Sequence, residues 1–259
     1  MFIYDMKRII NSAAFWGSVF VLVAVMFLGC FEDLEAARAN HLSVMYLFFV
    51  TTTVGITHVL IPAITIVPFM FCYLDEMQKG AIYYPLMRSS KKTYFSGIIF
   101  SALLSSAAVV LVSLILFTLI CLAFGAGWEA NASVIQFFKG DYFENMLEDS
   151  LGFVYIVHGI ALILFSMPWA VVGIVISLFT TQKYLIVAGP FVFFMLFSYF
   201  TELLGVFWLN PGWTLLKGSV RTRIGGGIFH AFAYQLIFII FLLLIYCLVW
   251  KRKLRYEGI

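Results

Sequence analysis

Six runs of apolar residues, each long enough to cross a lipid bilayer, dominate this sequence. A helix needs roughly 20 apolar residues to cross about 30 Å of hydrocarbon. The runs extend over approximately Ser12–Cys30, Ser43–Leu74, Thr93–Phe124, Leu151–Phe179, Lys183–Phe207 and Phe229–Trp250. They are apolar throughout, whereas the strands of a membrane barrel alternate between apolar and polar residues. The sequence therefore predicts an all-α membrane protein with six transmembrane helices.

Composition leaves little room for a soluble domain. Of 259 residues, 63% are hydrophobic and 11% are charged, whereas an average soluble domain has about 25% charged residues. We therefore expect residues 1–259 to form a single transmembrane domain surrounded by lipid, without a nucleic-acid partner. Pro62 and Pro68 interrupt the second run. Proline is tolerated within a span where neighbouring helices satisfy the freed carbonyl.

The distribution of lysine and arginine between the connecting segments predicts the orientation of the spans. With both termini in the cytoplasm, eleven basic residues lie on the inner side: Lys7, Arg8, Lys79, Arg88, Lys91, Lys92, Lys183, Lys251, Arg252, Lys253 and Arg255. Five lie outside: Arg38, Lys139, Lys217, Arg221 and Arg223. This excess predicts cytoplasmic termini and outer segments at 125–150 and 208–228. The outer cluster of Lys217, Arg221 and Arg223 opposes the rule, and either lies at the headgroups or faces a substrate or partner.

The first eleven residues have the pattern of an amphipathic helix. At 100° per residue, the apolar side chains fall on one face: Phe2, Ile3, Met6, Ile9 and Ile10. The polar side chains fall on the other face: Asp5, Lys7, Arg8 and Asn11. Such a segment can lie in the inner interface of the membrane. The alternative is a simple polar cap on the first transmembrane helix.

Polar side chains inside the spans are candidate functional residues, because burying them in lipid is costly. Glu202, near the outer end of the fifth run, could line a pathway, contact a cationic substrate, pair with Arg221 or Arg223, or reach the outer interface. His58 and His158 lie within the second and fourth runs, as hydrogen-bonded packing residues or as ligands. We expect no metal site.

The polar stretch 73–92 separates the second and third runs. It carries apolar and aromatic residues that a solvated linker would not need: Ile82, Tyr83, Tyr84, Leu86 and Met87. Such residues in a polar loop suggest a docking surface. Contact with the inner leaflet of the membrane is the competing explanation.

This stretch resembles the cytoplasmic loop of ABC-2 type permeases, the membrane subunits of many bacterial ABC exporters. In that family an acidic residue closes the second span, a glycine follows four residues later, and an apolar segment and a basic run precede an aromatic residue. The matching positions are Glu76, Gly80, Pro85–Met87, Arg88–Lys92 and Tyr94. The chain length, the amphipathic start, the basic tail 251–255 and the Asn210-Pro211 pair are also similar to that family.

The resemblance implies a multi-pass protein of the bacterial plasma membrane, paired with a second permease copy or a homologous permease around a central pathway. It implies that residues 73–92 form a coupling helix docked on a separate ABC ATPase subunit. The docking residues would be Asp75, Glu76, Gly80, Tyr83, Tyr84 and Arg88. The substrates implied are peptides, drugs or lipids.

This chain lacks a phosphate-binding GxxxxGK[ST] loop, so we expect no enzymatic activity or cofactor of its own. ATP and magnesium would bind the partner subunit. A secondary transporter driven by an ion gradient and a non-transport accessory or immunity protein that acts by binding are the alternatives.

Overall fold

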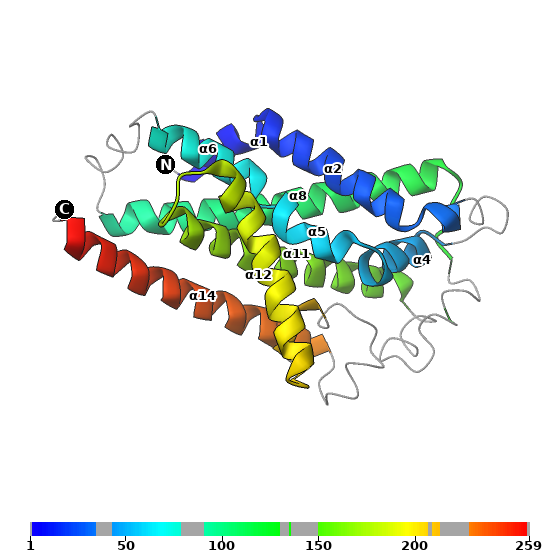
Figure 1. Cartoon of the computed structure of the whole chain (residues 1–259). Coiled ribbons are helices and arrows are strands. Elements are labelled where there is room, and N and C mark those ends of the chain that lie inside the picture. The colour runs from blue at the N-terminus through cyan, green and yellow to red at the C-terminus, as the bar shows by residue number, and fades with distance from the viewer. Residues whose placement is uncertain are drawn as a thin grey trace.

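The computed structural model describes residues 2–34, 43–78, 91–129, 135, 150–206, 209–212 and 228–257. These residues are all-helical, which confirms the predicted all-α class. The helices are α1 (Phe2–Ile10), α2 (Ala13–Gly29), α4 (Val44–Phe49), the π-helix η1 (Val50–Val54), α5 (Thr57–Ile64), α6 (Val67–Gln78), α8 (Lys91–Ala123), α11 (Leu151–Ser177), α12 (Lys183–Leu203) and α14 (Ile228–Glu257). Most of them run along one bundle (Figure 1).

Five stretches in the described part of the chain are long and apolar enough to cross a membrane. They are Thr57–Asp75, Ser96–Ala123, Leu151–Ser177, Lys183–Leu203 and Phe232–Val249. The protein is therefore a multi-pass membrane protein by the length and composition of its helices. Helix α2 is also apolar but has only 17 residues.

Helix α1 forms where the amphipathic pattern predicts it. Ile9 is buried and Met6 packs against the core, and α1 contacts both α6 and α8. Part of its apolar face is therefore covered by protein, whereas Ile10 remains exposed.

The predicted second span is broken into α4, η1, α5 and α6. Pro62 lies inside α5, and Pro68 lies in the first turn of α6, where a backbone N–H has no helical partner to lose. The structure adds a break at Gly55, whose N–H donates to Val50 O at 2.9 Å. A Cβ atom at Gly55 would lie 2.6 Å from Thr51 O, so this close backbone approach requires glycine.

Buried threonines make hydrogen bonds around the break. Thr51 Oγ1 donates to Met26 O of α2 at 2.7 Å and lies 2.9 Å from Thr57 Oγ1. Thr52 Oγ1 donates to Phe48 O at 2.7 Å. The Thr51 bond joins this segment to α2, and the Thr52 bond satisfies the hydroxyl within its own segment.

Helix α11 is the centre of the bundle, in contact with α5, α8, α12 and α14. Its Trp169 is fully buried, and the ring centroid lies 5.3 Å from Phe194 of α12 and 5.8 Å from Phe238 of α14. Ser106 Oγ of α8 donates to Ser166 O of α11 at 3.0 Å. One helix therefore supports the others through an aromatic cluster and a hydrogen bond between helices.

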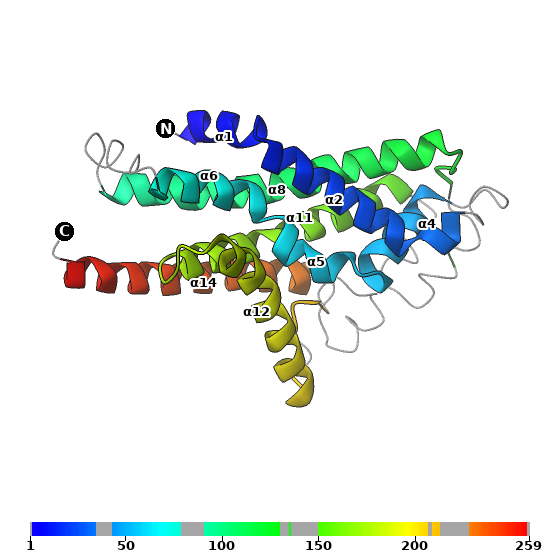
Figure 2. The ribbon, with the colours of Figure 1, turned by 45° about the horizontal axis from the view of Figure 1, so that its top comes forward.

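Two glycines allow close packing where α12 and the connection between α5 and α6 meet α11. A Cβ atom at Gly173 of α11 would lie 1.7 Å from Ile66 Cδ1, and one at Gly189 of α12 would lie 2.3 Å from Ile176 Cδ1. Only 22% of the α12 span is buried, against 67% of the α11 span, because α12 leaves the bundle at a steep angle (Figure 2). The glycine contact fixes the point at which it leaves.

We expect Gly173→Ala to destabilise the fold by about 1–3 kcal/mol, because the added methyl group overpacks a filled core. The measurement is thermal unfolding in detergent. Ile66→Val removes the Cδ1 atom that the methyl group meets, so the double variant should recover part of the loss. Gly152→Ala, at an open position of the same helix, is the control and should not destabilise. Equal stability of Gly173→Ala and Gly152→Ala would contradict the close contact.

Candidate functional site

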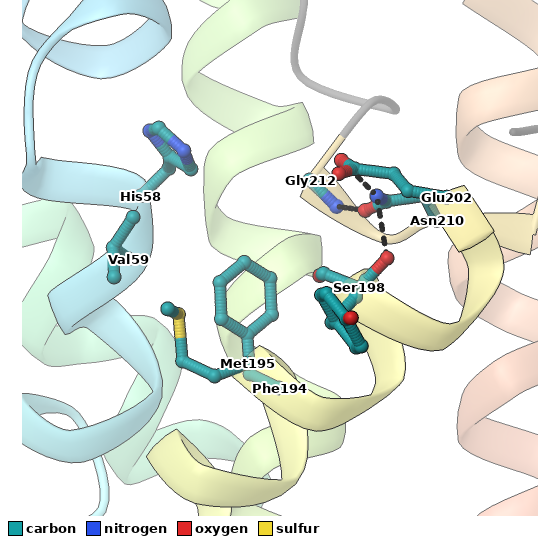
Figure 3. Close-up of a pocket in the computed structure, with 9 residues that line it drawn as sticks. His58, Val59, Phe194, Met195, Ser198, Glu202, Asn210 and Gly212 are labelled. Atoms are coloured by element: carbon teal, nitrogen blue, oxygen red, sulfur yellow. Dashed lines mark hydrogen bonds between the residues drawn. The ribbon is translucent and has the colours of Figure 1, made fainter.

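A pocket of 310 Å³ lies between α5, α12 and the segment 209–212 (Figure 3). Its volume is at the lower end of the range of small-molecule sites. The lining residues combine aromatic, apolar and polar side chains: His58, Val59, Phe194, Met195, Ser198, Tyr199, Glu202, Asn210 and Gly212. Two of the three intramembrane residues singled out from the sequence, His58 and Glu202, therefore line the same pocket.

The end of α12 places Glu202 in this pocket. Gly205 has a φ of +68°, its N–H donates to Glu202 O at 3.0 Å, and the N–H of Val206 donates to Thr201 O at 2.9 Å. This pair of bonds is a Schellman motif, which stops a helix and reverses the chain at a left-handed glycine. The reversal returns residues 209–212 to the last turn of α12.

Asn210 fixes the Glu202 carboxylate. Its side chain is 2% exposed, and Nδ2 donates to Glu202 Oε1 at 3.0 Å and to Ser198 O at 3.4 Å. Asn210 Oδ1 accepts from the N–H of Gly212 at 2.9 Å. Tyr234 of α14 donates through its hydroxyl to Leu209 O at 2.7 Å, which ties the same segment to a third helix. Asn210 is thus a positioning residue with all its amide atoms in use.

The position of Glu202 is electrostatically unfavourable for the helix. The C-terminus of a helix carries a partial negative charge, which disfavours a carboxylate in the last turn. The amide N–H of Asn210 offsets part of that cost. A carboxylate held at this place can attract a cation or accept hydrogen bonds from a donor in the pocket.

His58 faces Glu202 across the pocket (Figure 3). Its Nδ1 atom is buried and has no hydrogen-bond partner among the described residues. His158 lies elsewhere: Nε2 is 3.2 Å from Thr52 Oγ1, and the ring packs against Phe48 and Phe49 with centroids 5.3 and 4.3 Å away. Within the described ranges, no three His, Cys, Asp or Glu side chains gather as metal ligands do.

A second polar contact joins the other end of α12 to α6. Lys183 Nζ, at the first residue of α12, donates to Asp75 Oδ1 at 2.6 Å. The same Nζ lies 5.5 Å from the centroid of the Phe71 ring, one turn before Asp75. A lysine at a helix N-terminus and an aspartate near a helix C-terminus each oppose the helix dipole. Their pairing offsets both unfavourable placements.

The structure shortens the polar loop predicted over residues 73–92, because α6 continues to Gln78 and α8 begins at Lys91. Asp75 and Glu76 therefore belong to the last turn of α6, and Asp75 pairs within the chain. The other predicted docking and outer basic residues lie outside the described residues: Gly80, Tyr83, Tyr84, Arg88, Lys217, Arg221 and Arg223.

Two residues of these sites were not predicted as such from the sequence. Asn210 lies eight residues after Glu202, and Gly205 between them was the available signal for a helix stop and a chain reversal. Lys183 gave no signal beyond its positive charge, because its partner Asp75 is 108 residues away in the sequence.

Comparison of the chain with models of protein families, with curated proteins and with solved structures finds no match. What the protein does must therefore be inferred from the geometry of its own residues.

We expect Asn210→Ala to destabilise the fold by about 1–3 kcal/mol, because it leaves the buried N–H of Gly212 without its acceptor. Thermal unfolding in detergent measures the loss. Asn11→Ala, at an exposed position between α1 and α2, is the matched control and should be nearly neutral. An Asn210→Ala variant as stable as the control would show that Asn210 does not fix the end of α12.

Proposed function

We propose that this chain is the membrane-spanning permease subunit of an exporter driven by a separate ABC ATPase. The observation that carries the proposal is the Asp75–Lys183 ion pair. It joins the end of α6, where the segment that resembles a coupling loop begins, to the first residue of α12. The opposite end of α12 holds Glu202 in the pocket. One helix, α12, thus connects the proposed docking region with a site that can contact a substrate.

We propose six transmembrane helices with both ends of the chain in the cytoplasm. Helix α1 and the last turn of α14 lie at the same end of the bundle (Figure 1), which requires an even number of crossings. Helix α2 would complete the six, because its 17 residues span about 25 Å. The basic residues Lys7, Arg8 and Lys91 lie near this end, in agreement with a cytoplasmic side.

The partner implied inside the membrane is a second copy of this chain or a homologous permease. Helix α12 supports this pairing, because its outer half leaves the bundle with large apolar side chains exposed. Leu196, Phe200 and Leu203 are 52%, 53% and 67% exposed. In the proposed dimer they face the partner or the surrounding lipid.

A transporter driven by a proton gradient is the second candidate, favoured by one observation. His58 and Glu202, both titratable side chains, line the same pocket. Paired histidines and carboxylates inside membranes act as proton relays in pumps and transporters. Transport in reconstituted vesicles separates the two candidates: ATP with the ATPase subunit drives the first, and a pH gradient alone drives the second.

The topology predicts the activity of alkaline phosphatase fusions, since this enzyme folds only where its disulfides form outside the cytoplasm. A fusion after Ile135 should be active, and a fusion after Glu257 should be inactive. A cytoplasmic fluorescent reporter at the same two positions should give the opposite pattern. Activity at both positions would overturn the six-helix topology.

The coupling proposal predicts that purification from native membranes recovers a P-loop ATPase with this chain, and that Gly80→Trp lowers its recovery. Asp75→Lys should reduce ATP-driven transport in reconstituted vesicles severalfold. The reversed pair Asp75→Lys with Lys183→Asp should restore part of the activity, because the two charges can pair again. The ion pair is half exposed, with 35% exposure for Lys183 and 50% for Asp75, so its contribution to stability should stay below about 1 kcal/mol.

Glu32→Lys makes the same charge change at an exposed position after α2 and serves as the control. The coupling role of the ion pair is wrong if Asp75→Lys and Glu32→Lys transport equally well. The absence of any co-purified ATPase would count against the whole exporter proposal.

A further inference from the structure

The walls of the Glu202 pocket differ in chemical character (Figure 3). The Glu202 carboxylate and Ser198 lie at one side, Phe194 and Met195 lie in the middle, and His58 lies across from them on α5. The described lining contains one carboxylate and neither lysine nor arginine. The described lining therefore combines a carboxylate, an apolar floor and a separate imidazole.

Two groups on this side of the pocket can accept a hydrogen bond from a ligand, the Glu202 carboxylate and the Ser198 hydroxyl, and the hydroxyl can also donate. The Asn210 amide is already occupied, with its N–H groups on Glu202 and Ser198 O and its oxygen on the N–H of Gly212. A carboxylate accepts several hydrogen bonds at once, so the bond from Asn210 does not exclude a further donor at Glu202. Ser198 Oγ is buried without a hydrogen-bond partner among the described residues, and a buried hydroxyl left in this state is costly.

We propose that this pocket binds the protonated amine of an amphipathic molecule. The ammonium group donates to Glu202 and Ser198, and the aromatic rings of Phe194 and Tyr199 add attraction for the positive charge. The apolar part of the ligand lies over Phe194 and Met195. The inference rests on the proposed transport function, whose substrate class it names.

His58 fits the far end of such a ligand. Its Nδ1 atom is buried and lacks a hydrogen-bond partner in the described part of the chain, and a neutral imidazole nitrogen can either donate or accept. A hydroxyl or carbonyl group beyond the apolar part of the ligand would satisfy it. An anionic ligand is disfavoured because its charge would be desolvated beside Glu202.

The test uses the full-length protein in nanodiscs that contain phosphatidylcholine and phosphatidylglycerol but no amine lipid. Calorimetric titration compares octylammonium, octyltrimethylammonium and octanol, which share one chain and differ in charge and in N–H donors. Octylammonium should bind at least about tenfold more tightly than octanol, because it forms charge-assisted hydrogen bonds. Octyltrimethylammonium should fall between them, since it keeps the charge and loses the donors.

Variants assign the effect to residues. Glu202→Gln should lower the affinity for octylammonium by at least about tenfold and leave the affinity for octanol unchanged. Its amide oxygen can still accept from Asn210, so its melting temperature should stay near that of the wild type. Ser198→Ala should weaken the binding of octylammonium but not that of octyltrimethylammonium. This variant keeps the test valid if Glu202→Gln does not fold. Glu32→Gln makes the same change outside the pocket and should have no effect.

A further arm distinguishes a lipid headgroup from a free amine. If the natural amine is a lipid headgroup, nanodiscs with phosphatidylethanolamine should lower the apparent affinity for octylammonium. If the natural amine is a free molecule, the same nanodiscs should leave that affinity unchanged. Either result supports the amine site. Equal binding of octanol and octylammonium, or binding unaffected by both Glu202→Gln and Ser198→Ala, overturns it. No ATPase is present in this assay, so failure here leaves the exporter proposal standing, and a missing ATPase leaves the amine site standing.

Discussion

The position of α12 depends on its packing against α11 and α5. Gly189 of α12 leaves room for Ile176 of α11, and Gly173 of α11 leaves room for Ile66, in the connection between α5 and α6. This contact lies beside the aromatic cluster of Trp169. The N-terminal part of α12 is therefore held by the bundle, and its C-terminal part diverges from it (Figure 2). The pocket lies between this diverging part of α12 and α5.

Helix α12 carries its end charges against its own dipole. Lys183 opens the helix and Glu202 lies in its last turn, whereas a stable isolated helix would have the reverse order. Each unfavourable charge has a partner from another segment, Asp75 for the lysine and Asn210 for the carboxylate. Local preferences that are violated and then compensated by tertiary contacts are typical of functional positions. The same helix thus links the two polar regions, and it does so at a cost in its intrinsic stability.

Long apolar runs made the helical class and several helix boundaries predictable, because twenty apolar residues admit few structures in lipid. The starts of α11 at Leu151 and α12 at Lys183 agree with the sequence pattern. The break at Gly55 was not predicted, since a π-helical segment depends on hydroxyls that bond to another helix. His58 and Glu202 were recognised separately as costly residues in lipid, but their meeting in one pocket depends on the crossing angle of α12. That angle is set by packing, which no local pattern encodes.

The position of the glycine contact along α12 has a mechanical consequence. Gly189 lies six residues after Lys183 and thirteen before Glu202, which corresponds to about 9 Å and about 20 Å along a helix axis. If α12 tilts as one body about the glycine contact, its far end moves about twice as far as its near end. A small displacement of α6, delivered through the ion pair, would therefore arrive at the pocket enlarged and in the opposite direction. With these unequal lengths on either side of Gly189, α12 would act as a lever that converts a small movement at Lys183 into a larger movement at Glu202.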